Sequence, residues 1–120
     1  MDGERIKVLL VEDDGDSREL LAELLEDDFD VTTAADGVAG LKAFEDTHPD
    51  VVVTDESLPG MNGTELAQQV KEREPKARVV LVSGYAQVDG AEYCDAVLRK
   101  PIDVERLSRM VGELGDAARH

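Results

Sequence analysis

Charged and polar side chains stand at or just beyond the ends of short apolar runs in this sequence, in positions where they could act together. Glu12 and Asp13 follow the first run, and Asp55 follows the third. Ser83 and Lys100 stand in the same place after the fourth and fifth runs. If these runs are parallel strands, their carboxyl ends meet at one edge of a sheet, which is where open sheets bind ligands. The pattern therefore predicts three carboxylates, one hydroxyl and one ammonium group at a common site.

The three carboxylates indicate a bound cation. Glu12, Asp13 and Asp55 would repel one another and have raised pKa values without a counterion between them. Oxygen ligands favour Mg²⁺, with Mn²⁺ or Ca²⁺ less favoured, and Mg²⁺ needs few protein ligands because it retains water. For any single acid the alternative is a solvated loop, since the chain has 28 acidic residues. Asp14 and Asp16 are assigned to that alternative, as a helix cap and an exposed side chain.

Asp55 admits two interpretations, because a charged residue at the end of an apolar strand must face the sheet edge or be paired. In the first, Lys100 forms a purely structural salt bridge with it. In the second, Asp55 is a nucleophile towards phosphorus. Phosphoryl transfer needs a cation, further positive charge and hydrogen-bond donors around the transferred group. The predicted cation, the Lys100 ammonium and the Ser83 hydroxyl would supply these.

Two kinds of apolar pattern alternate along the chain and predict the elements that position these residues. Aliphatic or β-branched runs predict strands at 6–11, 29–34, 51–53, 79–82 and 96–98. Apolar residues at helical spacing follow four capping residues, Asp14, Asp36, Asn62 and Asp103. Alternation of this kind produces right-handed crossovers and a parallel sheet covered on both faces. We therefore expect an α/β fold, with a final segment, 115–120, that frays.

Composition excludes several classes of protein. The 120 residues fit one domain, 1–120, and a net charge of −15 disfavours binding to nucleic acid or to anionic membranes. The single cysteine, Cys94, excludes an internal disulfide and a cysteine-rich zinc site. No apolar run has the roughly 18 residues of a membrane-spanning helix. Residues 1–4 do not resemble a signal peptide, so a cytoplasmic protein is expected.

Taken in order, the motifs resemble the receiver domains of two-component response regulators, the family that includes the chemotaxis response regulator. The resemblance covers essentially the whole chain. Each motif alone is weak, but their combination is specific. The matching segments are VLLVEDD (8–14), VVVTD (51–55), LPGMNG (58–63), VLVSG (80–84) and LRKP (98–101).

This resemblance implies a doubly wound, five-stranded parallel sheet of order 2-1-3-4-5, the flavodoxin-like topology. It also implies that Asp55 is the phosphoacceptor and that Mg²⁺ is the cofactor. Asp13 and Asp55 would bind the ion directly, and the backbone carbonyl of Ser57 would complete the protein ligands. Glu12 would act through a coordinated water.

The resemblance assigns further roles and partners. Ser83 would be the switch hydroxyl, and Lys100 would bond a phosphoryl oxygen, with a cis peptide bond to Pro101. A sensor histidine kinase or a phosphotransfer protein would donate the phosphoryl group, and an unidentified protein would act downstream. The chain would catalyse only its own aspartyl phosphorylation and dephosphorylation. Neither His48 nor His120 has the helical context of a phosphodonor.

One departure from the family concerns the aromatic residue that usually switches with the hydroxyl. It stands three positions before the lysine, where this chain has Val97. Tyr85, two residues after Ser83, has three interpretations. It replaces the missing aromatic, it partly covers the phosphorylation site, or it is only an exposed loop residue.

A second departure concerns the fourth crossover. From Ser83 to Lys100 is only 17 positions (100 − 83), and the segment 86–95 contains Gly90 and little helical periodicity. We expect a short turn or an irregular loop in place of a full helix. Dimers in the family often form through the fourth helix, the fifth strand and the last helix. Because a shortened crossover would alter this face, the usual dimer is not assumed.

Two other functions compete with a phosphorylated receiver. One is a receiver-like docking module that is not phosphorylated, which the complete set of site residues opposes. The other is a flavodoxin-like cofactor enzyme. Such an enzyme would need a Ser/Thr/Gly-rich phosphate loop after the first strand, where this chain has acids that repel phosphate.

Overall fold

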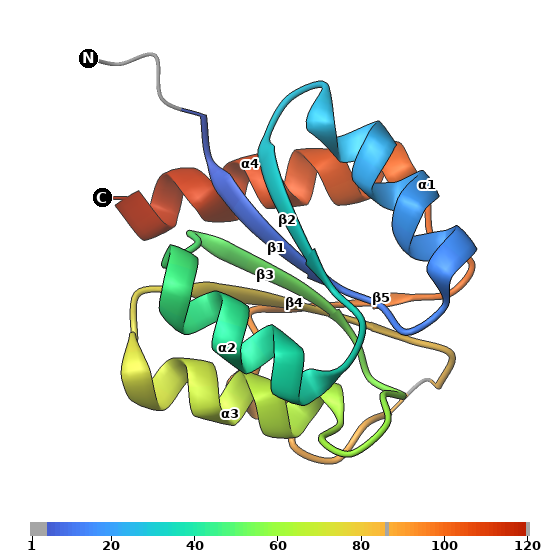
Figure 1. Cartoon of the computed structure of the whole chain (residues 1–120), viewed down its shortest axis with the longest axis vertical. Helices are drawn as coiled ribbons and strands as arrows, with labels where there is room; N and C mark the ends of the chain where they lie inside the picture. Colours follow the sequence, from blue (N-terminus) through green and yellow to red (C-terminus); the bar gives the residue numbers. More distant parts are fainter. Residues whose placement is uncertain (1–4, 86, 120) are drawn as a thin grey trace.

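A computed structural model describes residues 5–85 and 87–119. At its centre is a parallel sheet of five strands in the order β2-β1-β3-β4-β5 (Figure 1). The strands are β1 (Lys7–Val11), β2 (Asp30–Ala34), β3 (Val51–Asp55), β4 (Arg78–Ser83) and β5 (Ala96–Arg99). The expected doubly wound topology is confirmed, and each predicted strand lies within two residues of its observed bounds.

Within the described ranges, four helices connect or follow the strands, and side chains cap them. They are α1 (Gly15–Glu26), α2 (Gly37–Thr47), α3 (Gly63–Arg73) and α4 (Val104–Arg119). Asp14, Asp36 and Asn62 each accept a hydrogen bond from a first-turn N–H, which has no partner inside its helix. The Asp103 carboxylate accepts a hydrogen bond from the backbone N–H of Arg106 at 3.2 Å, so all four predicted caps are confirmed. None of these helices combines the length and apolar composition of a membrane span.

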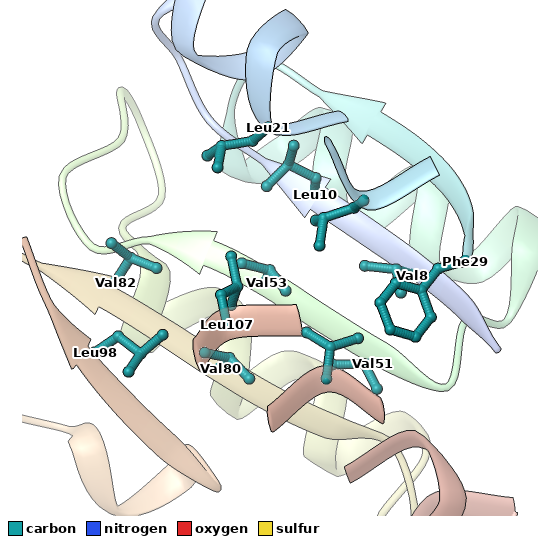
Figure 2. Close-up of a cluster of buried hydrophobic side chains, with 12 residues drawn as sticks. Val8, Leu10, Leu21, Phe29, Val51, Val53, Val80, Val82, Leu98 and Leu107 are labelled. Atoms are coloured by element: carbon teal, nitrogen blue, oxygen red, sulfur yellow. The ribbon is translucent and has the colours of Figure 1, made fainter. Parts of the chain in front are cut away.

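The helices cover the sheet in two layers, and each layer encloses an apolar core (Figure 1). On one face, α1 and α4 pack over Leu10 and Val53, with Leu107 of α4 at the centre of the cluster (Figure 2). On the other face, α2 and α3 pack over Leu9 and Val52. All five residues of β3 are buried, as expected of a central strand covered on both sides. The two cores hold the strand ends in fixed positions.

The fourth connection, between β4 and β5, has no long helix. Among its described residues the regular structure is one 3₁₀ turn, η1 (Ala91–Tyr93), which Gly90 precedes with a φ of 88°. The expected shortened crossover is therefore confirmed. The short connection leaves part of β5 uncovered, and Val97 is 40% exposed. Ala86, at the start of this segment, lies outside the described residues.

The expected fraying of 115–120 is wrong for the described part of that segment. The helix α4 continues to Arg119, and Gly115 is buried against Ile6. The Arg119 guanidinium pairs with the Asp50 carboxylate at 3.1 Å and ties the last turn to the amino edge of the sheet. These contacts join residues far apart in the sequence, so a local pattern could not indicate them. His120 lies outside the described residues.

Candidate functional site

The three predicted acids meet at the carboxyl edge of the sheet. One carboxylate oxygen from each of Glu12, Asp13 and Asp55 lies within 4.8 Å of the other two. Glu12 and Asp55 are buried, with 7% and 6% of their surfaces exposed, whereas Asp13 is exposed. The cluster therefore has two enclosed carboxylates and one open side. An open side suits Mg²⁺, which keeps several water ligands in protein sites.

Strand pairing brings these acids together. The strands β1 and β3 are neighbours in parallel register, so the residue after β1 adjoins the last residue of β3. The Glu12 N–H donates to the Ala34 carbonyl at 3.1 Å, and the Glu12 carboxylate accepts from the Asp14 N–H at 3.0 Å. Burial raises the pKa of the Glu12 carboxyl and the charge of Asp55 raises it further, while the bond from Asp14 offsets only part of this. A cation would relieve this electrostatic cost.

Lys100 places a positive charge beside the acids. Its Nζ lies 3.1 Å from Oδ1 of Asp55, which it reaches across the end of β4. Partial burial alone would lower the pKa of the ammonium group. The hydrogen bond to Asp55 and the charges of Asp55, Glu12 and Asp13 outweigh burial and raise that pKa. Lys100 is therefore charged at neutral pH, and its peptide bond to Pro101 is cis, as expected.

Ser83 ends β4, between the strands that carry Asp55 and Lys100. The residue is buried, and its Oγ accepts a hydrogen bond from the Tyr85 N–H at 2.9 Å. Because that bond uses an acceptor position, the hydroxyl proton remains available for donation. The Ser83 carbonyl accepts the Lys100 N–H at 2.9 Å, which ties the two strand ends together. Tyr85 is 66% exposed, and its three interpretations remain predictions.

Glu56 holds the loop that follows Asp55. Its carboxylate accepts the Thr64 N–H at 2.9 Å, and its carbonyl accepts the Gly63 N–H at 3.0 Å. Glycine is required at position 63 because a Cβ there would collide with the carbonyl oxygen of Asp55. No described residue donates a hydrogen bond to the Ser57 carbonyl, so that oxygen is free to accept a ligand.

Proteins of known family match this chain in sequence and in fold. A sequence profile of the response regulator receiver domain matches residues 8–112. This chain belongs to that family. It is a receiver domain of a two-component response regulator, and the docking module and flavodoxin-like enzyme are not favoured.

Regulators from several bacteria share the receiver sequence. The transcriptional regulatory protein CseB of Streptomyces avermitilis is 34% identical over 125 residues, which covers 96% of this chain and 53% of CseB. The regulatory protein AtoC of Escherichia coli is 31% identical over 88% of this chain and 24% of its own length. The receiver thus spans about half, or less, of these relatives.

Solved receiver structures share the fold. A receiver domain from Clostridium thermocellum superposes with a TM-score of 0.88 at 27% identity, over 95% of this chain and 97% of that one. TrrA from Thermotoga maritima, solved in complex with Mg²⁺-BeF, gives a TM-score of 0.83 at 29% identity, over 91% and 98% of the two chains.

A hollow of about 440 Å³ opens beside the acids of the receiver. Its polar wall includes the three acids and Lys100. Its apolar wall comes from α1, from the segment before α4 and from the first residue of α4, and contains Leu20, Leu21, Pro101, Ile102 and Val104. Leu20 is 57% exposed, and Leu24, one turn further along α1, is 43% exposed. An accessible apolar surface therefore adjoins the polar site.

The motif spacing did not indicate two contacts that support the site. Nη1 of Arg18 donates to the carbonyl oxygen of Glu12 at 2.9 Å, and the Glu56 carboxylate binds the N-terminus of α3. Arg18 is a polar residue on an amphipathic helix, and Glu56 is one of 28 acids, so neither has a distinguishing pattern. Only their positions in the fold show what they contact.

Proposed function

We propose that this receiver accepts a phosphoryl group on Asp55 and that phosphorylation changes its docking to a partner. The observation that carries the proposal is the environment of the Asp55 carboxylate. It is buried, lies 3.1 Å from the Lys100 ammonium and shares a 4.8 Å cluster with two other carboxylates. A structural salt bridge alone would not require Glu12 and Asp13 at the same place, where their charges repel Asp55.

Glu12, Asp13 and Asp55, with the carbonyl of Ser57, are the residues that would hold Mg²⁺. The donors are all oxygen atoms, and one side of the cluster is open for water. When bound, Mg²⁺ would place positive charge against the oxygens of the transferred group. The Mg²⁺-BeF complex of the similar receiver TrrA supports the choice of ion.

In the proposed transfer, the ionised Asp55 carboxylate is the nucleophile. One of its oxygens forms the new O–P bond while the bond from phosphorus to a histidine nitrogen of the donor breaks. The donor imidazole is the leaving group, and its nitrogen keeps the electron pair of the broken bond. The Lys100 ammonium would exchange its bond with Asp55 for one with a phosphoryl oxygen, and the Ser83 hydroxyl would donate to another. Catalysis by this chain would be limited to its own phosphorylation and dephosphorylation.

The proposed donor is a cytoplasmic histidine kinase or phosphotransfer protein, which would dock on the apolar wall of the hollow. Leu20 lines the hollow beside the acids, and Leu24 is exposed one turn further along α1. Burying both against an apolar helix of the donor would bring its histidine to Asp55. The net charge of −15 disfavours nucleic acid as an alternative partner of this surface.

Incubation with acetyl phosphate and Mg²⁺, followed by intact mass spectrometry, tests the acceptor. The wild-type chain should gain the mass of one phosphoryl group, and removal of Mg²⁺ with EDTA should abolish the gain. Asp55→Asn should gain nothing, whereas the matched variant Asp16→Asn, which changes an exposed acid of α1, should behave as wild type. A gain in Asp55→Asn would assign the modification to another residue. No gain in the wild-type chain would favour the unphosphorylated docking module.

A further inference from the structure

Arg18 binds the backbone that carries two of the clustered acids. It lies near the start of α1, and its Nη1 donates to the Glu12 carbonyl oxygen at 2.9 Å. Glu12 follows Val11, the last paired residue of β1, so its carbonyl lies beyond the hydrogen-bond ladders of the sheet. No other described residue donates to this oxygen. The guanidinium therefore supplies a hydrogen bond that the sheet no longer provides.

The bonded carbonyl belongs to the peptide unit that joins Glu12 to Asp13. A peptide unit is planar, so holding its oxygen also sets the direction in which the chain continues to Asp13. Glu12 has two further restraints, because its N–H binds Ala34 and its carboxylate accepts from Asp14. Asp13 is exposed, and its placement therefore depends on the backbone more than on packing of its side chain.

We infer that Arg18 is a positioning residue, which holds the Glu12–Asp13 peptide so that both carboxylates face Asp55 and form a cation site in advance. The inference rests on the proposed Mg²⁺ site and adds a residue that does not itself contact the ion. Removing a group that orients metal ligands without contacting the metal commonly weakens metal binding. Arginine suits this task because its planar fork loses little freedom for each hydrogen bond that it makes.

Mg²⁺ titrations followed by backbone NMR shifts test this role. Arg18→Met should raise the dissociation constant for Mg²⁺ about tenfold. Arg18→Lys should raise the dissociation constant less, because the lysine ammonium keeps the positive charge but lacks the planar set of N–H donors of a guanidinium group. Arg109→Met, which changes an exposed arginine of α4, should bind Mg²⁺ as wild type does. Without Mg²⁺, the carbonyl carbon resonance of Glu12 should shift in Arg18→Met and stay in place in Arg109→Met.

A folded Arg18→Met chain that binds Mg²⁺ with wild-type affinity would overturn the inference, even if its melting temperature falls. The proposed function would survive that result. If Arg18→Met does not fold, Arg18→Lys decides: weaker Mg²⁺ binding supports the positioning role, and wild-type binding contradicts it. A wild-type chain that binds no Mg²⁺ would overturn the proposed metal site, and this inference with it, before any variant is compared.

Discussion

At the scale of single residues, the Asp95 carboxylate anchors the fourth connection to the rest of the fold. Its Oδ2 accepts from Lys71 Nζ at 2.7 Å and from the Val79 N–H at 2.8 Å, and its Oδ1 lies 3.3 Å from Arg78. Burial alone would raise the pKa of this carboxyl. The hydrogen bonds from Lys71 and Val79, the charge of Lys71 and the bond from Arg78 outweigh burial and lower the pKa. The folded chain therefore favours the ionised form.

Asp95→Asn should lower the free energy of unfolding at pH 7 by about 2 kcal/mol, because charge-assisted hydrogen bonds are lost. A depressed pKa contributes stability above the ordinary carboxyl pKa, and this contribution is lost as the pH falls through the folded value. The difference in the free energy of unfolding between wild type and variant should therefore become smaller below about pH 4. Urea unfolding across this pH range measures it, with Asp16→Asn as the control. An equal difference at every pH would mean that the carboxylate charge has no such role.

At the scale of elements, the short fourth connection touches the first turn of α3 through Gly90. A Cβ at position 90 would lie 3.1 Å from the Thr64 Cβ, and Gly90 has a φ of 88°, in the left-handed region. Thr64 in turn donates its N–H to Glu56, the residue after Asp55. The segment that replaces a crossover helix is thus packed against the turn of α3 that binds Glu56, and a side chain at position 90 would disturb that packing.

Gly90→Ala should lower the free energy of unfolding by about 1–2 kcal/mol, the usual cost of a left-handed conformation for a residue with a Cβ. Gly84→Ala is the matched control, since a Cβ there meets nothing within 4 Å and its φ is not in that region. Urea denaturation of both variants measures the difference. Equal stabilities would show that the connection adjusts around position 90 without cost.

At the scale of the whole molecule, a net charge of −15 opposes the compact state, because the acids repel one another. NaCl should therefore raise the melting temperature of the wild type and of Asp13→Asn alike. At equal ionic strength, MgCl₂ should raise that of the wild type further. Binding only to the native state contributes about 1.4 kcal/mol at ten times the dissociation constant. Asp13→Asn should lack this extra gain, whereas Asp16→Asn, with the same net charge, should keep it. Equal gains in both variants would contradict the site assignment.

Much of this receiver follows from the sequence alone, because the determining interactions are local. Apolar runs predicted the strands, because strands buried on both faces of a sheet are rich in aliphatic side chains. Oxygen-bearing side chains ahead of helical patterns predicted the caps, because the first N–H groups of a helix lack internal partners. Residues that follow the apolar runs, such as Glu12 and Asp55, could be assigned to a common edge, since parallel strands end on the same side. The motif resemblance supplied the sheet order and the proposed roles.

Tertiary structure decided the contacts between residues far apart in the chain. Three such contacts depend on which strands and helices are neighbours: the 3.1 Å approach of Lys100 to Asp55, the anchoring of Asp95, and the Arg119–Asp50 pair at the last turn of α4. The hydrogen bond from Arg18 to Glu12 joins residues that are close in sequence, but it requires α1 to leave β1 at a particular angle. No pattern of residue types indicates such an angle or partner, because packing of the two cores sets them together.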